Sequence, residues 1–197
     1  MKLKKCPVCE LNYIEEGEDM CNICKGIENE PHLVKPHEGA EIFSGRFFFV
    51  FQGKSFELES REGYVWAPKY AGVHHWDRVR EIKVGDCIIH AESGYIRAIS
   101  FATSQNYDYK RDGVVGRRVD CKYYLLKYPI RTKTYYNEIL QYRGDNYPPF
   151  NKKGNGNMGY LYNLTNTLAT VFIEGIIKYN PYLKALEKSL TRSNIII

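Results

Sequence analysis

The sequence predicts an α+β domain built on a small, strongly curved β-sheet or barrel that is flanked by helices. Two observations lead to this fold class. Short runs of β-branched and aromatic residues, bounded by Gly and Pro, occupy the middle of the chain, and apolar residues at helical spacing appear only towards its C-terminal side. Five or six short strands are therefore expected, and 197 residues are enough to bury a core around them.

The expected strands follow one another from residue 46 onwards. RFFFVFQG (46–53) is an aromatic run that ends at a glycine, SFELESREG is expected to form a helical turn or two, and GYVWAP should be a strand that stops at Pro68. The clearest hairpin is VGDCIIHAESGYIRAISFA, with its turn at residues 92–94. RRVDCKYYLLKYPI is expected to be a further strand that ends at Pro129.

Helical patterns follow these strands. TKTYYNEILQYR carries apolar and aromatic residues at helical spacing, and LTNTLATVFIEGIIKY is an amphipathic helix with Thr165 as its N-cap. A short helix is expected at 183–190, and YPPFNKKGNGNMG has the composition of a loop. Cys87 and Cys121 lie alone in apolar strand patterns, so both are expected in the core.

Four cysteines near the N-terminus have the spacing of a structural zinc site. Cys6, Cys9, Cys21 and Cys24 form C-x2-C, eleven residues and a second C-x2-C, with a hairpin expected to turn at EEGED. Four thiolates leave no open coordination position, so Zn²⁺ would be structural rather than catalytic. Two disulfides or an iron–sulfur site are the alternatives. Because the surrounding residues are acidic, we expect this ribbon to dock onto the next domain or a partner.

We divide the chain into four expected regions. Residues 1–28 form the zinc-ribbon module, 29–45 a linker that contains prolines and a glycine, 46–190 the main domain and 191–197 a tail. The net charge of +5 is divided unevenly, because residues 1–45 hold five Lys against nine acidic residues, a net −4, and the rest holds 23 Lys and Arg against 14 acidic residues, a net +9. The basic part is the better candidate for contacting phosphates, and 17 tyrosines favour a binding protein.

The sequence lacks the common catalytic motifs. It contains no P-loop, G-x-G-x-x-G, H-E-x-x-H or G-x-S-x-G pattern. His74 and His75 in HHWD are adjacent and would point to opposite faces of a strand, and the E-x-K triplet that begins at Glu81 arises by chance in many chains. Glu57 and Glu59 are expected on a solvated face. We therefore expect no catalytic residues and no enzyme activity in this chain.

The sequence also lacks signals for membranes or secretion. No apolar run approaches the roughly 18 to 20 residues that span a bilayer, and the opening MKLKKCPVCE lacks the apolar region of a secretion signal. A cytoplasmic location is the expectation.

Several motifs occur in an order that resembles a known family. A strand enters F-Q-G-K in RFFFVFQGKSFELESREGYVWAPKY, and W-A-P follows. Then come H-W, I-K-V-G-D in the place of a V-x-x-G-D pattern, and A-I-S in HHWDRVREIKVGDCIIHAESGYIRAISFATSQNYD, with G-Y-L-Y near the end. From residue 46 to about 170 the chain is similar to the EVE and YTH-like reader domains of the PUA superfamily. It resembles in particular the N-terminal specificity domains of type IV, McrB-like and HNH-associated, modification-dependent restriction endonucleases.

This resemblance implies a pocket that accepts one flipped, modified base. The chain would then be the DNA-binding specificity part of an anti-phage restriction system, reading a methylated or hydroxymethylated base in duplex DNA. Cleavage would come from a nuclease domain or subunit outside this sequence. A reader of modified RNA and a zinc-dependent interaction module without nucleic acid are the alternatives.

The resemblance also implies site residues. Trp66 aligns with the family's first cage tryptophan, Gln52 would read a base edge and Gly53 would let the backbone approach the ligand. The second wall would be Tyr107 rather than Tyr109. The pocket residues implied are Trp66, Gln52, Gly53, Ala67, Pro68, Tyr107, Tyr109 and Trp76, the last of which is as well placed to be core. The phosphate-binding candidates are Lys54, Lys110, Arg111, Arg117, Arg118, Lys152 and Lys153.

Overall fold

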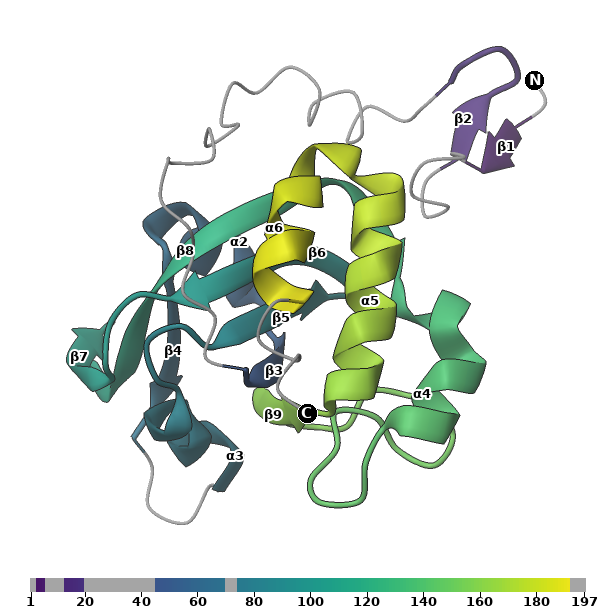
Figure 1. Ribbon diagram of the computed structural model, residues 1–197. Coiled ribbons are helices and arrows are strands. Elements are labelled where there is room, and N and C mark those ends of the chain that lie inside the picture. Colours follow the sequence, from purple (N-terminus) through teal and green to yellow (C-terminus); the bar gives the residue numbers. More distant parts are fainter. Residues whose placement is uncertain (1–2, 6–12, 20–44, 70–73, 192–197) are drawn as a thin grey trace.

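A computed structural model describes residues 3–5, 13–19, 45–69 and 74–191, and its main body is one curled, seven-stranded sheet covered by helices (Figure 1). The strand order is β4 (Tyr64–Pro68), β8 (Val114–Arg131), β6 (Tyr95–Ala102), β5 (Cys87–Glu92), β3 (Phe47–Phe51) and β9 (Leu161–Leu164), and β7 (Tyr107–Arg111) pairs with β8. Only β3 and β5 run parallel among these neighbours. The predicted α+β class with a curved sheet is confirmed.

Strand β3 shows why the sheet is buried on both faces. Phe47 and Phe49 point into a core that also contains Phe172 of α5, whereas Phe48 and Val50 point into a second core on the opposite face. A strand buried on both faces needs apolar residues at every position, which explains the unbroken FFFVF run.

The second core lies on the inner face of the curl. It draws side chains from β4 at one end of the strand order and from β9 at the other, including Val65, Ala67 and Leu161. The backbone N–H of Trp66 in β4 donates to the hydroxyl of Tyr160, which immediately precedes β9, at 3.2 Å. A side chain therefore bridges the two ends of the sheet.

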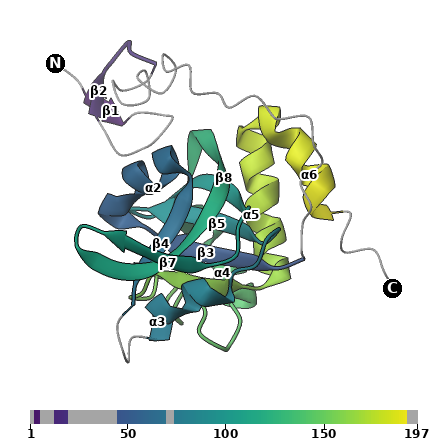
Figure 2. The ribbon, with the colours of Figure 1, turned by 90° about the vertical axis from the view of Figure 1, so that its left-hand side faces the viewer.

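Helices cover the outer face. The helix α5 (Asn166–Tyr179) and α6 (Lys184–Thr191) pack against this face of the sheet, and η4 (Pro181–Leu183) joins them (Figure 2). Thr165 caps α5 as predicted, because its Oγ1 accepts from the Leu168 N–H at 3.3 Å. The remaining helical segments are η1 (Gly53–Ser55), α2 (Phe56–Glu62), α3 (His74–Asp77), η2 (Arg78–Glu81), η3 (Thr132–Tyr135) and α4 (Tyr136–Tyr142).

The structure corrects the expected elements at several points. The HHWD segment is the short helix α3 and not a strand, and β7 and β9 were not predicted as strands. Strand β8 is 18 residues long and does not end at Pro129. Between the pairs Ala98–Leu125 and Ile96–Ile130 the register shifts, so Pro129 lies in a bulge where no ladder hydrogen bond needs its missing N–H. The expected core positions Cys87 and Cys121 are buried.

The N-terminal strands form a sheet of their own. β1 (Leu3–Lys5) pairs antiparallel with β2 (Tyr13–Glu15), and a turn follows at EEGED, where the Glu18 N–H donates to the Glu15 carbonyl at 3.0 Å. Cys6, Cys9, Cys21 and Cys24, most of the expected linker and the last six residues lie outside the described residues. Within the described part of the chain, no helix has both the length and the apolar character needed to cross a membrane.

Asn180 satisfies the backbone that the β8 bulge leaves unpaired. Its side chain is fully buried, its Oδ1 accepts from the Tyr128 N–H at 2.9 Å, and its Nδ2 donates to the carbonyls of Tyr128 at 3.0 Å and Ile176 at 3.1 Å. The Tyr182 hydroxyl likewise accepts from the Lys127 N–H and donates to the Leu125 carbonyl. The bulge is therefore held by side chains that follow α5.

We predict that Asn180→Ala lowers the free energy of unfolding by about 2 kcal/mol, because it leaves buried backbone groups of Tyr128 without partners. Urea denaturation would measure this change. Asn137→Ala, at an exposed position of α4, is the matched control and should change stability by less than about 0.5 kcal/mol. Equal effects of the two substitutions would contradict the assigned role.

Candidate functional site

A cluster of polar side chains fills the inner face of the curled sheet. We call it the Glu59 cluster, and its seven members lie on or next to seven different elements. Glu59 lies on α2, Gln52 follows β3, His90 lies on β5 and Ser100 on β6. The cluster is completed by Tyr123 of β8, Tyr160 before β9 and Arg111 of β7. Because these residues are far apart in sequence, only the fold brings them together.

The Glu59 carboxylate is the centre of this cluster. It is completely buried, and its Oε2 accepts from Gln52 Nε2 and from the Tyr160 hydroxyl, both at 2.5 Å. Its Oε1 accepts from Arg111 Nη1 at 2.9 Å. Burial raises the pKa of Glu59, whereas the hydrogen bonds from Tyr160, Gln52 and Arg111 oppose that rise. The buried charge therefore depends on these three donors.

The orientation of Gln52 follows from its carboxylate partner. A carboxylate accepts, so the amide nitrogen faces Glu59, and Gln52 Oε1 faces His90 Nδ1 at 2.8 Å. His90 Nδ1 must then donate, which leaves Nε2 to accept from the Ser100 hydroxyl at 2.6 Å. Burial lowers the pKa of His90 to about 3, so the imidazole is neutral at physiological pH.

Tyr123 ties this network to β4. Its hydroxyl accepts from Gln52 Nε2 at 3.0 Å and donates to the Tyr64 carbonyl at 2.8 Å. Its ring lies 4.3 Å from the His90 ring, measured between centroids. Burial raises the pKa of Tyr123 well above its usual range, so the phenol stays protonated. His90, Ser100 and Tyr123 all have less than a tenth of their surface exposed, and their hydrogen bonds link them to one another through Gln52 and to the Tyr64 carbonyl, so they organise the cluster.

Trp66 and Arg111 form the outer end of the cluster. The Arg111 guanidinium carbon lies 3.8 Å from the centroid of the indole, so the two planar groups are in cation–π contact. Trp66 Nε1 donates to the Tyr109 carbonyl at 3.2 Å, and a Cβ on Gly116 would lie 2.3 Å from the indole, which leaves space only for glycine there. In this conformation Trp66 is 6% exposed, and Arg111 covers it.

The structure brings together two of the residues that the family resemblance placed in one pocket. Trp66 and Gln52 are joined through Tyr160 and Glu59, because Tyr160 accepts from the Trp66 N–H and donates to the carboxylate that Gln52 also contacts. Tyr109 is linked to Trp66 through its carbonyl. Tyr107, the preferred second wall, is 38% exposed and its hydroxyl donates to Asp120.

The other pocket candidates have different surroundings. Gly53 is exposed, with φ +49° and open space where a side chain would point. Ala67 is buried in the inner core, and Pro68 is half-buried. Trp76 is half-buried against that same core, so it contributes to packing. Base contact by any of these residues stays a prediction.

The phosphate-binding candidates divide into paired arginines and exposed lysines. Arg111 is paired with Glu59, Arg117 lies 3.1 Å from Asp108, and Arg118 lies 2.8 Å from Asp120 while its guanidinium covers the Tyr64 ring. The exposed lysines are Lys54, Lys110, Lys152 and Lys153. Because the arginines already have acidic partners, the lysines are the more accessible cations.

Sequence reasoning missed the residue on which the cluster depends. Glu57 and Glu59 were both expected on a solvated face, and only the Glu57 side chain is exposed, at 74%. Glu59 is three residues after Phe56, which is itself buried, and residues three apart share a helix face. That spacing was the available signal for Glu59. Tyr160 lies in the G-Y-L-Y motif, which gave it no role in the site, and nothing in the sequence pointed to His90. Within the described ranges, no group of three or more His, Cys, Asp or Glu side chains is arranged to hold a metal.

Comparisons with known proteins give only distant matches. No family model matches the sequence, and no curated protein matches it. A crystal structure of a protein from Pseudomonas putida covers 66% of this chain and 99% of its own, with a TM-score of 0.47 and 12% identity. Human THYN1, crystallised in complex with DNA containing 5-methylcytosine, covers 66% of this chain and 97% of its own, with a TM-score of 0.45 and 12% identity. A protein from Rhodopseudomonas palustris, solved by NMR, covers 70% and 94%, with a TM-score of 0.44 and 12% identity. Likenesses this weak carry no inference about what the present chain binds.

We predict that His90 makes stability fall as the pH is lowered. Its folded pKa of about 3 lies below its ordinary value of 6.5, so its contribution is complete above pH 6.5 and is lost as the pH falls towards 3. Glu59 acts in the opposite direction, because its raised pKa favours the folded state on protonation. Relative to His90→Asn, the unfolding free energy of the native chain should therefore fall by about 1.4 kcal/mol more per pH unit in this window.

Chemical denaturation at a series of pH values would measure that difference in slope. In NMR spectra the His90 ring signals should not shift between pH 8 and 5, and the other four histidines of the chain serve as internal references. A His90 signal that titrates near pH 6.5 would show that the ring is not held neutral by burial.

Proposed function

We propose that this chain is the DNA-binding specificity domain of a modification-dependent, type IV-like restriction system, and that it has an EVE/YTH-like fold. Its ligand would be a methylated or hydroxymethylated base, flipped out of duplex DNA. The observation that carries the proposal is the position of Arg111, whose planar guanidinium is stacked on Trp66 and hydrogen-bonded to the buried Glu59 carboxylate. The order of motifs in the sequence supports it independently.

The guanidinium occupies a site whose chemistry also suits a nucleobase. A flat base with an exocyclic amine can stack on the indole and donate to the carboxylate. Acidic side chains accept a hydrogen bond from the amine of cytosine in the same way. Flipping a base costs a few kcal/mol of lost stacking, and an aromatic face returns roughly 1 to 3 kcal/mol per stacked base. The carboxylate and Gln52 would supply the remaining contacts, so a base entering here displaces Arg111.

The displaced arginine would have a second use. Once Glu59 bonds to the base, the Arg111 guanidinium becomes free for a backbone phosphate, together with Lys110 beside it on β7. Lys54, exposed in η1 near Gln52 in sequence, is a further candidate. This exchange keeps the buried carboxylate hydrogen-bonded in both states, which matters because a buried carboxylate without donors is costly.

The proposal assigns no catalysis to the chain. His90 and Ser100 are hydrogen-bonded to each other, but both are completely buried. A nuclease domain or subunit elsewhere would cut the DNA. A reader of modified RNA is the second candidate, because stacking and amine recognition at the Glu59 cluster would serve a single-stranded RNA base equally well.

We predict that Trp66→Ala weakens binding to modified duplex DNA by about tenfold or more and removes its preference over unmodified DNA. Fluorescence anisotropy at a fixed salt concentration would measure this with duplexes that carry methylcytosine, hydroxymethylcytosine or methyladenine. Methylated RNA is the arm that tests the second candidate. Tyr179→Ala, which removes a half-exposed aromatic side chain of α5, is the matched control.

Glu59→Gln provides a test that preserves the shape of the cluster. It removes the charge that would accept the base amine, so it should reduce affinity for modified DNA while circular dichroism shows an intact fold. The proposal is wrong if folded Trp66→Ala and Glu59→Gln proteins both keep the modified-base preference.

We propose that Cys6, Cys9, Cys21 and Cys24 bind structural Zn²⁺. The support is their C-x2-C spacing, and β1 and β2 flank the first pair on both sides. Mass spectrometry of the metal content is expected to find about one zinc per chain, and Cys21→Ser should lose it. Cys121→Ser, at a buried cysteine of β8, is the control and should retain the metal.

A further inference from the structure

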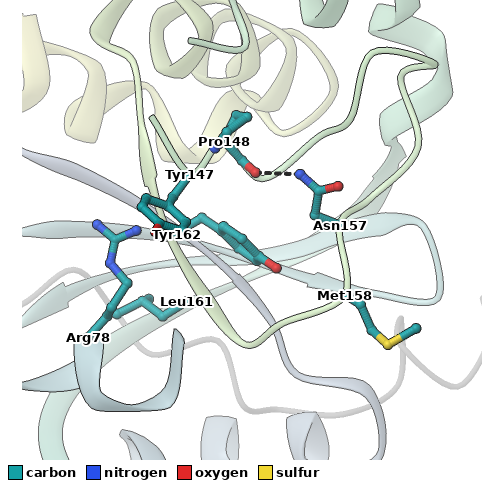
Figure 3. A pocket seen from close by; sticks show the side chains of 7 residues that line it. All are labelled: Arg78, Tyr147, Pro148, Asn157, Met158, Leu161 and Tyr162. Carbon is teal, nitrogen blue, oxygen red and sulfur yellow. Dashed lines mark hydrogen bonds between the residues drawn. The ribbon is translucent and has the colours of Figure 1, made fainter. Parts of the chain in front are cut away.

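A cavity of about 450 Å³ lies beside β9 (Figure 3). Its lining residues come from η2, from the loop between α4 and β9, and from β9 itself. They are Arg78, Tyr147, Pro148, Asn157, Met158, Leu161 and Tyr162. Asn157 Nδ2 donates to the Pro148 carbonyl at 2.8 Å, which ties the two sides of the loop together. The volume falls in the range of small-molecule sites.

Arg78 is the unusual member of this lining. The residue is 6% exposed, and its Nη2 donates to Glu81 Oε2 at 3.2 Å. Its Nε and Nη1 are buried and have no hydrogen-bond partner among the described residues. These two nitrogens carry three of the five N–H donors of a guanidinium. Buried donors without acceptors are costly, so an acceptor from outside that reaches these two nitrogens through a shift of the Arg78 side chain would complete this site.

We propose that this cavity binds a second nucleobase, with hydrogen-bond acceptor atoms on the edge of the base that faces Arg78. Tyr147, which is 66% exposed, provides an aromatic face for stacking, and the buried Tyr162 forms part of the wall. Figure 3 shows the Arg78 guanidinium directed towards Tyr147. Guanine offers O6 and N7 as neighbouring acceptors, and cytosine offers O2 and N3. On the corresponding edge of adenine the N6 amine lies beside N7, so that edge would present a donor to the donors of Arg78.

A phosphate group suits the cavity less well than a base. Arg78 is the only charged residue among the described residues that line the cavity, so a phosphate dianion would remain partly uncompensated among tyrosine, proline, leucine and methionine. The phosphates belong at the rim instead. Lys152 and Lys153 are exposed on the same loop, which is held by the Asn151 side chain accepting from the N–H groups of Lys153 and Asn155.

The chain connects the cavity directly to the Glu59 cluster. Tyr160 bonds to Glu59, and the next two residues, Leu161 and Tyr162, line the cavity. Two bases of one nucleic-acid strand would therefore be read on either side of this short segment. The inference rests on the proposed function only for the source of the base, because recognition by Arg78 does not involve Trp66.

Isothermal titration calorimetry with GMP, CMP, AMP and inorganic phosphate tests the proposal on the full chain. GMP or CMP should bind, and the affinity for AMP should be lower by about tenfold or more. Inorganic phosphate should not compete with the nucleotides. Arg78→Met should abolish nucleotide binding, and Arg80→Met, which removes an exposed arginine two residues later, should leave it unchanged.

Two further measurements keep the test decisive. Arg78→Met should leave the melting temperature unchanged or raise it, because it removes two buried nitrogens that have no hydrogen-bond partner, and the carboxylate of its ion-pair partner Glu81 is 40% exposed to water. If that variant is unstable, Tyr147→Ala, which alters only the exposed mouth, should weaken GMP or CMP binding. Binding retained by both variants, or phosphate binding as strongly as the nucleotides, would overturn the proposal. Trp66→Ala should bind nucleotides normally, so failure at one site is distinguishable from failure at the other.

Discussion

The buried carboxylate of Glu59 is the constraint on which much of this structure depends. It receives hydrogen bonds from residues next to β3 and β9 and from β7, and it lies on α2. A buried charge is tolerated only when donors surround it, so these four elements must hold their relative positions. Through Tyr160 the same carboxylate is coupled to Trp66, at the opposite end of the strand order. The polar cluster therefore helps to close the curl of the sheet.

The curl itself arises in β8. Residues 114–120 of β8 pair with β7 and β4, and residues 121–131 pair with β6, so this one long strand joins both parts of the curled sheet. Bulges next to His90 and after Leu125 add the extra bend that strands need to close on themselves. Buried Asn180 takes up backbone hydrogen bonds that the second bulge leaves unmade. The bulge therefore bends the sheet, and the Asn180 side chain bonds to the backbone groups that the bulge leaves without a strand partner.

The charges near Trp66 are largely neutralised within the protein. The net +9 of residues 46–197 suggests a strongly basic surface, yet Arg111, Arg117 and Arg118 each have an acidic partner. Arg78 is also paired, with Glu81, but two of its buried nitrogens have no hydrogen-bond partner among the described residues, whereas Arg117 has one such nitrogen. A count of charges cannot separate these cases, because the difference lies in what each guanidinium contacts. In the two proposals a base displaces Arg111 from the Glu59 carboxylate, whereas a base supplies the hydrogen-bond acceptors that Arg78 lacks.

The sequence by itself determined the local elements. Aromatic and β-branched runs located β3, β4, β5, β6 and part of β8, and helical spacing with an N-cap threonine located α4 and α5. These patterns are local, because the burial of one face or both faces of an element fixes the spacing of apolar residues along its own sequence. Strands β7 and β9 carry less regular patterns, and Pro129 concealed the length of β8, since a bulge is set by the partner strand.

Only the tertiary structure decided the site. Trp66 and Gln52 were recognised from motif order, but their connection through Glu59 and Tyr160 joins residues up to 108 positions apart, from Gln52 to Tyr160. Whether a glutamate on a short helix is solvated or buried depends on which strand it packs against, and no local pattern records that. The donors left open on Arg78 were likewise invisible, because an unmet hydrogen bond is a property of the assembled cavity.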